Sequence, residues 1–345
     1  MAPADQTILI TGASGFVGSG VVLRVLQEGY KVVLTVRDET QIPWLKKVFG
    51  HEDQVKFVVI PDFLKEGAFD EVVKGVDYVI HTASPIPKPD MASEWKKNYI
   101  DPAVKPTVSL LEAAKAEPKI KKVVVTSSCI SFVPMDRSEL GESRTTSEAK
   151  GNPKVGEDFH DTEFGFPFGA YHGSKIAGDI ATWNFRDEKK PHYAIVTINP
   201  DFVYGPIPVL KSKEALDDHH TTSAILWREY NGIDGLLRYQ DTDHSVHIDD
   251  VAEAHVKVLD DKYKDGERFI LSAGEFKWDD LLAYAQKKYP EMDFKLNPIP
   301  SWKDGWSALY YRLDASKAEK ELDIKFKDIY TQFDDLVAAM KKFDA

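Results

Sequence analysis

A phenol and an ammonium group lie four residues apart at Tyr171 and Lys175, in the stretch YHGSK. Side chains four residues apart share one face of a helix. A free tyrosine has a pKa near 10 and exchanges protons poorly at neutral pH, whereas a neighbouring ammonium stabilises the phenolate and lowers that pKa. The pair is therefore a candidate proton donor, although a Tyr-xxx-Lys spacing alone also arises by chance on helix surfaces.

Two hydroxyl groups precede this pair in the stretch VVVTSSCIS, which ends an apolar run with Ser127 and Ser128. If the run is a buried parallel strand, its carboxyl end faces the ligand crevice. A serine there could donate a hydrogen bond to a carbonyl oxygen that gains negative charge. Both serines fit this role. The adjacent Cys129 is better explained as a small buried residue than as a nucleophile.

A glycine pattern lies near the start of the chain, in TILITGASGFVGSGVVLRVL. The strand-like run ends at a turn through Gly12, Gly15 and Gly18, and a helical pattern follows. Glycines allow a tight turn and a close approach of the backbone to a ligand, while the helix N-terminus offers free N–H groups to a pyrophosphate. A purely structural turn is the alternative, but the strand–turn–helix setting favours a dinucleotide-binding loop.

These groups need a scaffold, and the first part of the chain alternates strand-like and helix-like segments. The predicted strands are Val- and Ile-rich runs without strict alternation, as in parallel strands buried on both faces. They lie at residues 7–11, 31–36, 55–60, 76–82, 122–128 and 193–198. One helix begins near Val17 and ends before Gly29, and another carries YHGSK to about Arg186. This alternation predicts an α/β fold with a doubly wound parallel sheet.

The pattern changes after residue 200, where loops lengthen and Gly and Pro become frequent. We expect residues 1–200 and about 245–272 to form the main domain, with residues 245–259 returning to its sheet as a strand and helix. Residues of about 201–244 and 273–345 would form a smaller C-terminal lid domain. The charged segment 136–163 is expected to be exposed loop. Several aromatic side chains could line an apolar pocket or belong to the core: Phe132, Tyr204, Trp227, Trp302, Trp306, Tyr310 and Tyr311.

Composition narrows the class of protein. Hydrophobic residues make up 43% of the 345 residues and charged residues 29%, which is typical of a globular chain, and the net charge of -12 disfavours nucleic acid and anionic membranes as partners. The single cysteine can form no internal disulfide, and the first residues have neither a basic segment nor a long apolar one. We expect a cytoplasmic enzyme with a small-molecule substrate; a monomer and a homodimer both remain open.

The motifs together resemble one family. The spacing Gly-xx-Gly-xx-Gly, followed in order by VRDE, HTASP, TSS, YHGSK, NPDFVYGP and HIDDVAEAH, is similar to that of extended short-chain dehydrogenases/reductases. The resemblance covers nearly the whole chain and is strongest to the dihydroflavonol-4-reductase-like branch, especially fungal NADPH-dependent carbonyl reductases that act on methylglyoxal and other aldehydes and ketones. It implies a Rossmann sheet with a smaller C-terminal substrate-binding domain, and reduction of a carbonyl by NADPH.

The resemblance also assigns roles. It implies that Tyr171 protonates the carbonyl oxygen, that Lys175 also holds the nicotinamide ribose, and that Ser128 rather than Ser127 donates to the oxygen. Asp62 would accept a hydrogen bond from the adenine amino group. The cofactor-binding residues implied are Gly12, Ser14, Gly15, Phe16, Val17, Arg37, Asp62, Phe63, Thr82, Ala83, Ser84, Tyr171, Lys175, Pro200 and Val203. No metal is implied.

The end of the second strand bears on the choice between NADPH and NADH. An acidic residue there would bind the ribose hydroxyls of NAD. This chain has Arg37 first, whose guanidinium can bind a 2′-phosphate in bidentate fashion, and Asp38 after it. Some relatives place a Lys about seven residues later, where this chain has Trp44, with Lys46 and Lys47 beyond.

Two departures and two alternatives accompany the resemblance. Relatives usually read PAVxGT on the fourth helix, whereas Pro106 replaces the glycine here, and FPFGA stands where cinnamoyl-CoA reductases carry Trp-Tyr-Cys before the tyrosine. A sugar-nucleotide epimerase shares the fold and the Ser-Tyr-Lys group, but prefers an acidic residue at position 37. A non-catalytic NADP-binding sensor often lacks the Tyr or the Lys, and this chain has both.

Overall fold

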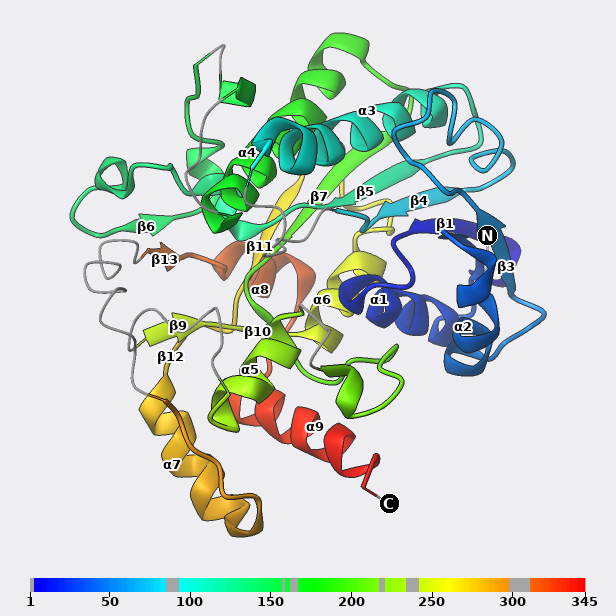
Figure 1. The fold of residues 1–345 in the computed structure, drawn as a ribbon. Coiled ribbons are helices and arrows are strands. Elements are labelled where there is room, and N and C mark those ends of the chain that lie inside the picture. The colour runs from blue at the N-terminus through cyan, green and yellow to red at the C-terminus, as the bar shows by residue number, and fades with distance from the viewer. Residues whose placement is uncertain are drawn as a thin grey trace.

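The central feature of the computed structural model is one parallel sheet with helices on both faces (Figure 1). The structure describes residues 3–84, 93–156, 159–161, 167–216, 221–233, 242–297 and 311–344. The predicted aromatics Trp302, Trp306 and Tyr310 lie outside these residues. In the described part of the chain, no helix is long and apolar enough to cross a membrane.

The sheet has seven strands in the order β11-β7-β5-β4-β1-β2-β3, and every neighbouring pair is parallel. The strands are β1 (Thr7–Thr11), β2 (Lys31–Val36), β3 (Val55–Val59), β4 (Tyr78–His81), β5 (Lys122–Thr126), β7 (Ala194–Pro200) and β11 (Arg268–Leu271). The six predicted strands all form, and β11 adds a seventh at one edge. The doubly wound fold is thereby confirmed, and the crevice lies at the carboxyl ends of β1 and β4, where the strand order reverses.

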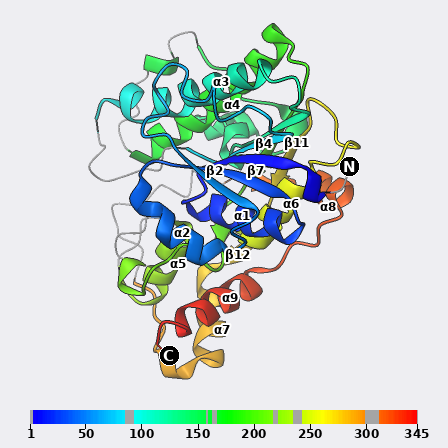
Figure 2. The ribbon, with the colours of Figure 1, turned by 90° about the vertical axis from the view of Figure 1, so that its right-hand side faces the viewer.

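Helices cover the two faces as the alternation predicts (Figures 1 and 2). The face below the sheet in Figure 1 carries α1 (Phe16–Gln27), α2 (Ile42–Phe49) and α6 (Ile248–Lys257), and the face above it carries α3 (Asp101–Lys115) and α4 (Pro167–Lys189). The strands bury both faces between these helices, which explains why their sequences are continuously apolar rather than alternating. α3 runs through Pro106 without ending and follows a π-helical turn at Lys96–Ile100.

A smaller group of elements lies beyond the carboxyl ends of the strands, with α7 and α9 farthest from α3 and α4 (Figure 2). Its helices are α5 (Thr222–Tyr230), α7 (Trp278–Lys288) and α9 (Ile329–Lys341), while α8 (Ser316–Leu322) packs on β11. Its two-stranded sheets pair β8 (Val203–Tyr204) with β10 (Val246–His247), β9 (Thr242–His244) with β12 (Glu275–Lys277), and β6 (Thr145–Thr146) with β13 (Arg312–Leu313). Phe132, Tyr204, Trp227 and Tyr311 are buried in the hydrophobic clusters of the core.

Two local expectations are wrong in part. Helix α6 packs on the main sheet as expected, but the strand before it does not join that sheet. β10 pairs with β8 and not with the main sheet, because α6 begins directly after His247 and leaves only two residues for a strand. The segment 136–163 is not simply exposed loop: the carboxylate of Glu148 accepts a hydrogen bond from the Ile270 backbone at 2.6 Å, and Asn152 is half-buried. Residues 148–152 therefore dock onto the edge strand β11.

Candidate active site

The glycine turn between β1 and α1 is a close contact between backbones. Gly12 has φ +76°, a conformation that favours glycine. A methyl group at Gly18 would lie 2.1 Å from the carbonyl oxygen of Gly12 and 2.7 Å from Oγ1 of Thr82, so α1 can approach β1 and β4 only with glycine there. Gly20, which the sequence pattern did not single out, does the same against Ile248 of α6, whose side chain lies 2.7 Å from its missing Cβ.

The open side of this turn fits a pyrophosphate. Gly15, the N-cap of α1, is exposed, and a methyl group built there would meet only the Gly12 oxygen, at 3.3 Å. No side chain caps the first turn of α1, so its N–H groups remain available to an anion. Ser14 and Val17 are half-buried beside this turn, while Phe16 is buried in the core.

The adenosine end of the predicted site consists of exposed side chains. Arg37 directly follows β2, and its backbone N–H donates to the side chain of Gln41. Asp38 accepts a hydrogen bond from the Thr40 backbone at 2.7 Å, which holds its pKa below the usual value. This carboxylate is thus engaged in capping a turn, whereas no ion pair of Arg37 is found within the described residues.

The other predicted adenosine contacts also lie beyond strand ends. Asp62 is exposed after β3 and accepts from the Leu64 backbone at 2.8 Å through one oxygen. Phe63 is half-buried against Phe69, with ring centroids 5.0 Å apart. Trp44 lies on α2 and donates to the Val209 carbonyl, while Lys47 lies over its ring. Trp44 therefore fixes α2 to the loop after β8 rather than offering a cation to a phosphate.

The loop after β4 and the end of β7 line the middle of the crevice. Thr82 donates its hydroxyl to the Thr11 carbonyl at 2.7 Å and so ties this loop to β1. Ala83 and Ser84 follow it and are half-buried. Pro200 is the last residue of β7, and Val203 is buried in β8 just beyond it.

The helix α4 places Tyr171 and Lys175 on one side, as predicted. Lys175 Nζ lies 5.5 Å from the centroid of the Tyr171 ring and donates to Ser84 Oγ at 2.9 Å. Burial lowers the pKa of Lys175 to about 8, although the Asp179 carboxylate acts in the opposite direction. Burial also raises the pKa of Tyr171, and nearby Cys129 adds to this shift. The pKa of Tyr171 thus lies above its ordinary value, opposite in direction to the lowering expected from the sequence, and burial is the largest cause.

The two candidate serines occupy different surroundings. Ser127 is buried and lines a small cavity together with Lys175 and His81. Ser128 is half-buried and caps the 3₁₀ turn Cys129–Phe132, accepting from the Ile130 backbone at 3.4 Å. That bond uses the oxygen of Ser128 as an acceptor, so its hydroxyl proton can be donated elsewhere. This arrangement suits Ser128 better than Ser127 as a donor toward a substrate.

His172, which sequence reasoning missed, anchors the loop after Ser128. Its Nε2 donates to the carbonyls of Ile130 and Val133 at 3.0 and 2.7 Å, because carbonyl oxygens can only accept. The sequence holds one indication of this role. His172 directly follows Tyr171 on a helix, so its side chain must point away from the Tyr171 side chain, toward a different neighbour. The Ser128 loop is therefore fixed to the same helix that carries Tyr171 and Lys175.

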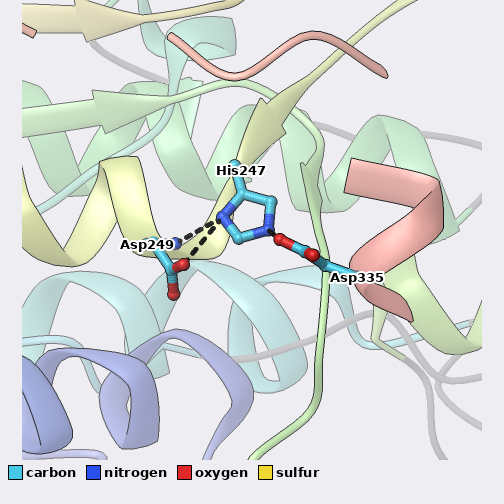
Figure 3. Close-up of side chains that lie close together, drawn as sticks. All are labelled: His247, Asp249 and Asp335. Atoms are coloured by element: carbon cyan, nitrogen blue, oxygen red, sulfur yellow. Dashed lines mark hydrogen bonds and ion pairs between the residues drawn. The ribbon is translucent and has the colours of Figure 1, made fainter. Parts of the chain in front are cut away.

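A separate cluster lies at the N-terminus of α6 (Figure 3). His247 Nδ1 accepts from the Asp249 backbone at 3.0 Å, so the ring proton resides on Nε2, which faces Asp335 at 3.2 Å. Burial lowers the pKa of His247 and keeps the ring neutral. Lys327 Nζ lies 2.6 Å from Asp249 and 3.5 Å from Asp335. A metal ion here would have to displace that ammonium and the Nε2 proton, so the cluster is a helix cap that joins α6 to α9.

The chain is similar to known proteins in both sequence and fold. Residues 8–272 match the NAD dependent epimerase/dehydratase family. The chain is 35% identical to ketoreductase sphI of Aspergillus fumigatus, with 94% of each chain covered, and 31% identical to tetraketide alpha-pyrone reductase 1 of Arabidopsis thaliana, with 99% of this chain and 97% of that one covered. A crystal structure of yeast methylglyoxal/isovaleraldehyde reductase Gre2 complexed with NADPH has 26% identity and a TM-score of 0.82 over 98% of this chain and 99% of that one.

Proposed function

Because the chain belongs to the NAD dependent epimerase/dehydratase family, we propose a function within it: NADPH-dependent reduction of an aldehyde or ketone to an alcohol. The relatives described above are named as reductases, not epimerases, and the yeast one binds NADPH. The observation that carries the proposal is the placement of Tyr171, Lys175 and the anchored Ser128 loop at the carboxyl ends of β4 and β5.

The proposed cofactor site is the one implied by the sequence. The uncapped first turn of α1 and the open side of Gly15 would hold the pyrophosphate, Arg37 the 2′-phosphate and Asp62 the adenine. Thr82, Ala83, Ser84, Pro200 and Val203 would line the nicotinamide half. NADPH supplies a hydride to the carbonyl carbon when bound.

The chain's own residues supply the proton and stabilise charge. The phenol of Tyr171 is protonated at neutral pH and can donate to the carbonyl oxygen. Burial raises its pKa and so opposes this transfer, which makes a cation beside the phenolate necessary. The ammonium of Lys175 then faces the phenolate left behind. Ser128 donates a hydrogen bond to the oxygen while its negative charge grows. One hydride and one proton convert the carbonyl to an alcohol, and solvent reprotonates Tyr171.

We propose two domains with separate tasks. Residues 1–200 and about 245–272 would bind the cofactor, and about residues 201–244 and 273–345 would form the substrate-binding domain. We propose a small-molecule carbonyl substrate, a cytoplasmic location and a monomeric or homodimeric state. Sedimentation of the purified protein distinguishes the two oligomeric states.

The test is NADPH oxidation by the purified protein across aldehydes, ketones, flavanonols and CoA thioesters, with Tyr171→Phe measured beside it. We expect turnover of at least one aldehyde or ketone that depends on Tyr171. An epimerase would instead retain tightly bound cofactor absorbance after gel filtration. Absence of turnover with every carbonyl, or equal turnover by the variant, would contradict the proposal.

A further inference from the structure

The carboxylate of Asp179 is the centre of a buried network one turn beyond Lys175 on α4. It is 2% exposed, and its Oδ2 accepts from Asn152 Nδ2 at 2.8 Å, from Trp183 Nε1 at 3.2 Å and from the guanidinium of Arg268. Its Oδ1 faces Asn199 Nδ2 at 3.5 Å. A buried carboxylate with this many donors is a rigid ionic centre, because each donor lowers the cost of burying the charge.

Two of these donors reach onward to the loop that begins at Ser128. Asn152 Nδ2 also donates to the Ser131 carbonyl at 3.0 Å, so its two amide hydrogens bridge that carbonyl and Asp179. Asn199 Nδ2 lies 3.4 Å from the Ser128 carbonyl and 3.3 Å from Ser131 Oγ. The Asn152 bonds are the shorter ones and should carry most of the coupling.

Arg268, the cation of this network, also contacts the loop that begins at Ser128. The Arg268 guanidinium lies close to two rings, 4.3 Å from the centroid of Phe132 and 5.0 Å from that of Trp183. Phe132 ends the 3₁₀ turn that Ser128 caps. Arg268 also donates to Asn152 Oδ1 at 3.0 Å, which fixes the orientation of that amide. All hydrogen-bonding atoms of the Asn152 side chain are therefore used.

We propose that Asp179 and Asn152 are positioning residues that hold Ser128 in register with Tyr171 and Lys175, so that the serine hydroxyl meets the substrate oxygen. The inference rests on the proposed function of Ser128. It also gives a function to Asn152 in segment 136–163, because this residue connects the segment to the Ser128 loop and to Asp179. A serine that can swing by about 1 Å loses much of its value as a preorganised donor.

The main experiment is a double-mutant cycle between Asn152→Ala and Ser128→Ala, measured with a carbonyl substrate of the wild-type enzyme. Asn152 is half-buried, so its variant should fold. We expect Asn152→Ala to lower kcat about 10-fold, or ~1.4 kcal/mol, with the KM for NADPH changed less than 2-fold. In the Ser128→Ala background the same change should lower kcat less than 2-fold, because the group that it positions is gone.

Trp183→Phe is the matched control. It removes one hydrogen bond to the same Asp179 oxygen and keeps a ring beside Arg268, and the indole N–H that it removes donates to Asp179 and not to the Ser128 loop. Its kcat should stay within 2-fold of wild type. A double variant, Asp179→Asn with Arg268→Met, removes both charges together and should lower kcat at least as much as Asn152→Ala, because it also removes the carboxylate that raises the pKa of Lys175.

The outcomes separate this inference from the proposed function. If Ser128→Ala alone leaves kcat unchanged, the assigned role of Ser128 fails, and this inference with it. If Ser128→Ala lowers kcat but Asn152→Ala lowers it equally in both backgrounds, only the positioning inference is overturned. An equal loss in Trp183→Phe would likewise overturn it, since the effect would then be general loosening of α4.

Discussion

The two ends of the crevice are built in opposite ways. At the catalytic end Lys175 and Asp179 are buried, and every element that carries a reactive group is bonded to its neighbours within the protein. At the adenosine end Arg37 and Asp62 are exposed. One end is therefore preorganised by the fold, whereas the other depends on the ligand for its contacts. Changes at the first end should affect turnover and stability, and changes at the second should affect only cofactor choice.

The largest effect is expected for Tyr171→Phe. Removing the only proposed proton donor should lower kcat by about 10²- to 10⁴-fold, the range typical of general acid catalysis. NADPH affinity should stay within about 3-fold, since the ring still packs against Phe168 at 6.1 Å between centroids. Stopped-flow kinetics and NADPH fluorescence titration measure the two quantities. Turnover within a few-fold of wild type would reject Tyr171 as the acid.

The glycine turn between β1 and α1 lies between the two ends of the crevice. It contains one glycine that the packing of the fold requires, Gly18, and one on its open side, Gly15. Gly18→Ala places a methyl group 2.1 Å from the Gly12 oxygen, so it should destabilise the protein itself, at or above the upper end of roughly 1–3 kcal/mol for overpacking. Gly15→Ala meets one atom at 3.3 Å and should leave the unfolding free energy nearly unchanged while weakening NADPH. Urea unfolding without cofactor measures the difference. Equal destabilisation by both changes would contradict this division.

The features of the site that can be predicted from the sequence are those set by the local chain, and the features that cannot are those set by tertiary contacts. Gly12, the strand pattern and the Tyr171–Lys175 spacing are local signals, because they follow from backbone conformation and helical repeat. The bridge from Asn152 to Asp179 joins residues with no common periodicity, in a segment expected to be plain surface. The direction of the Tyr171 pKa was also out of reach, since burial is set by tertiary packing.

A pH experiment tests how strongly the catalytic end is buried. Burial lowers the pKa of Lys175 from 10.5 to about 8. Below pH 8 Lys175 is charged in both the folded and the unfolded chain, so burying the ammonium reduces the unfolding free energy. Between pH 8 and 10.5 only the unfolded chain holds that proton, so the unfolding free energy rises with pH, by roughly 1.4 kcal/mol per pH unit.

The comparison that isolates this group is wild type against Lys175→Met in urea unfolding at pH 7, 8, 9 and 10, without cofactor. The wild type should gain stability relative to Lys175→Met as the pH rises through 8. Lys46→Met, which removes an exposed lysine of α2, should run parallel to wild type. A constant difference between wild type and Lys175→Met would mean that Lys175 is solvated like any surface lysine.

An effect confined to one cofactor is expected at the adenosine end, where Arg37 alone is assigned the 2′-phosphate. Hydrogen bonds to a charged group contribute about 1.5–3 kcal/mol, which corresponds to roughly 10- to 150-fold in affinity. Arg37→Ala should therefore lower kcat/KM for NADPH by that factor and leave NADH nearly unchanged. Asp38 should not raise the use of NADH in this variant by binding its ribose hydroxyls, because the Asp38 carboxylate already accepts a hydrogen bond from the Thr40 backbone at 2.7 Å.

Lys46→Ala provides the control for that measurement, because it removes a nearby exposed cation from α2 and should weaken NADPH less than 3-fold by long-range attraction alone. If the two variants lose NADPH equally, the 2′-phosphate is attracted by general positive charge rather than bound by one guanidinium. If Arg37→Ala weakens both cofactors equally, Arg37 supports the fold of the β2–α2 loop. Selective loss of NADPH would instead show that a single exposed residue sets cofactor choice, while the buried network at the other end sets the rate.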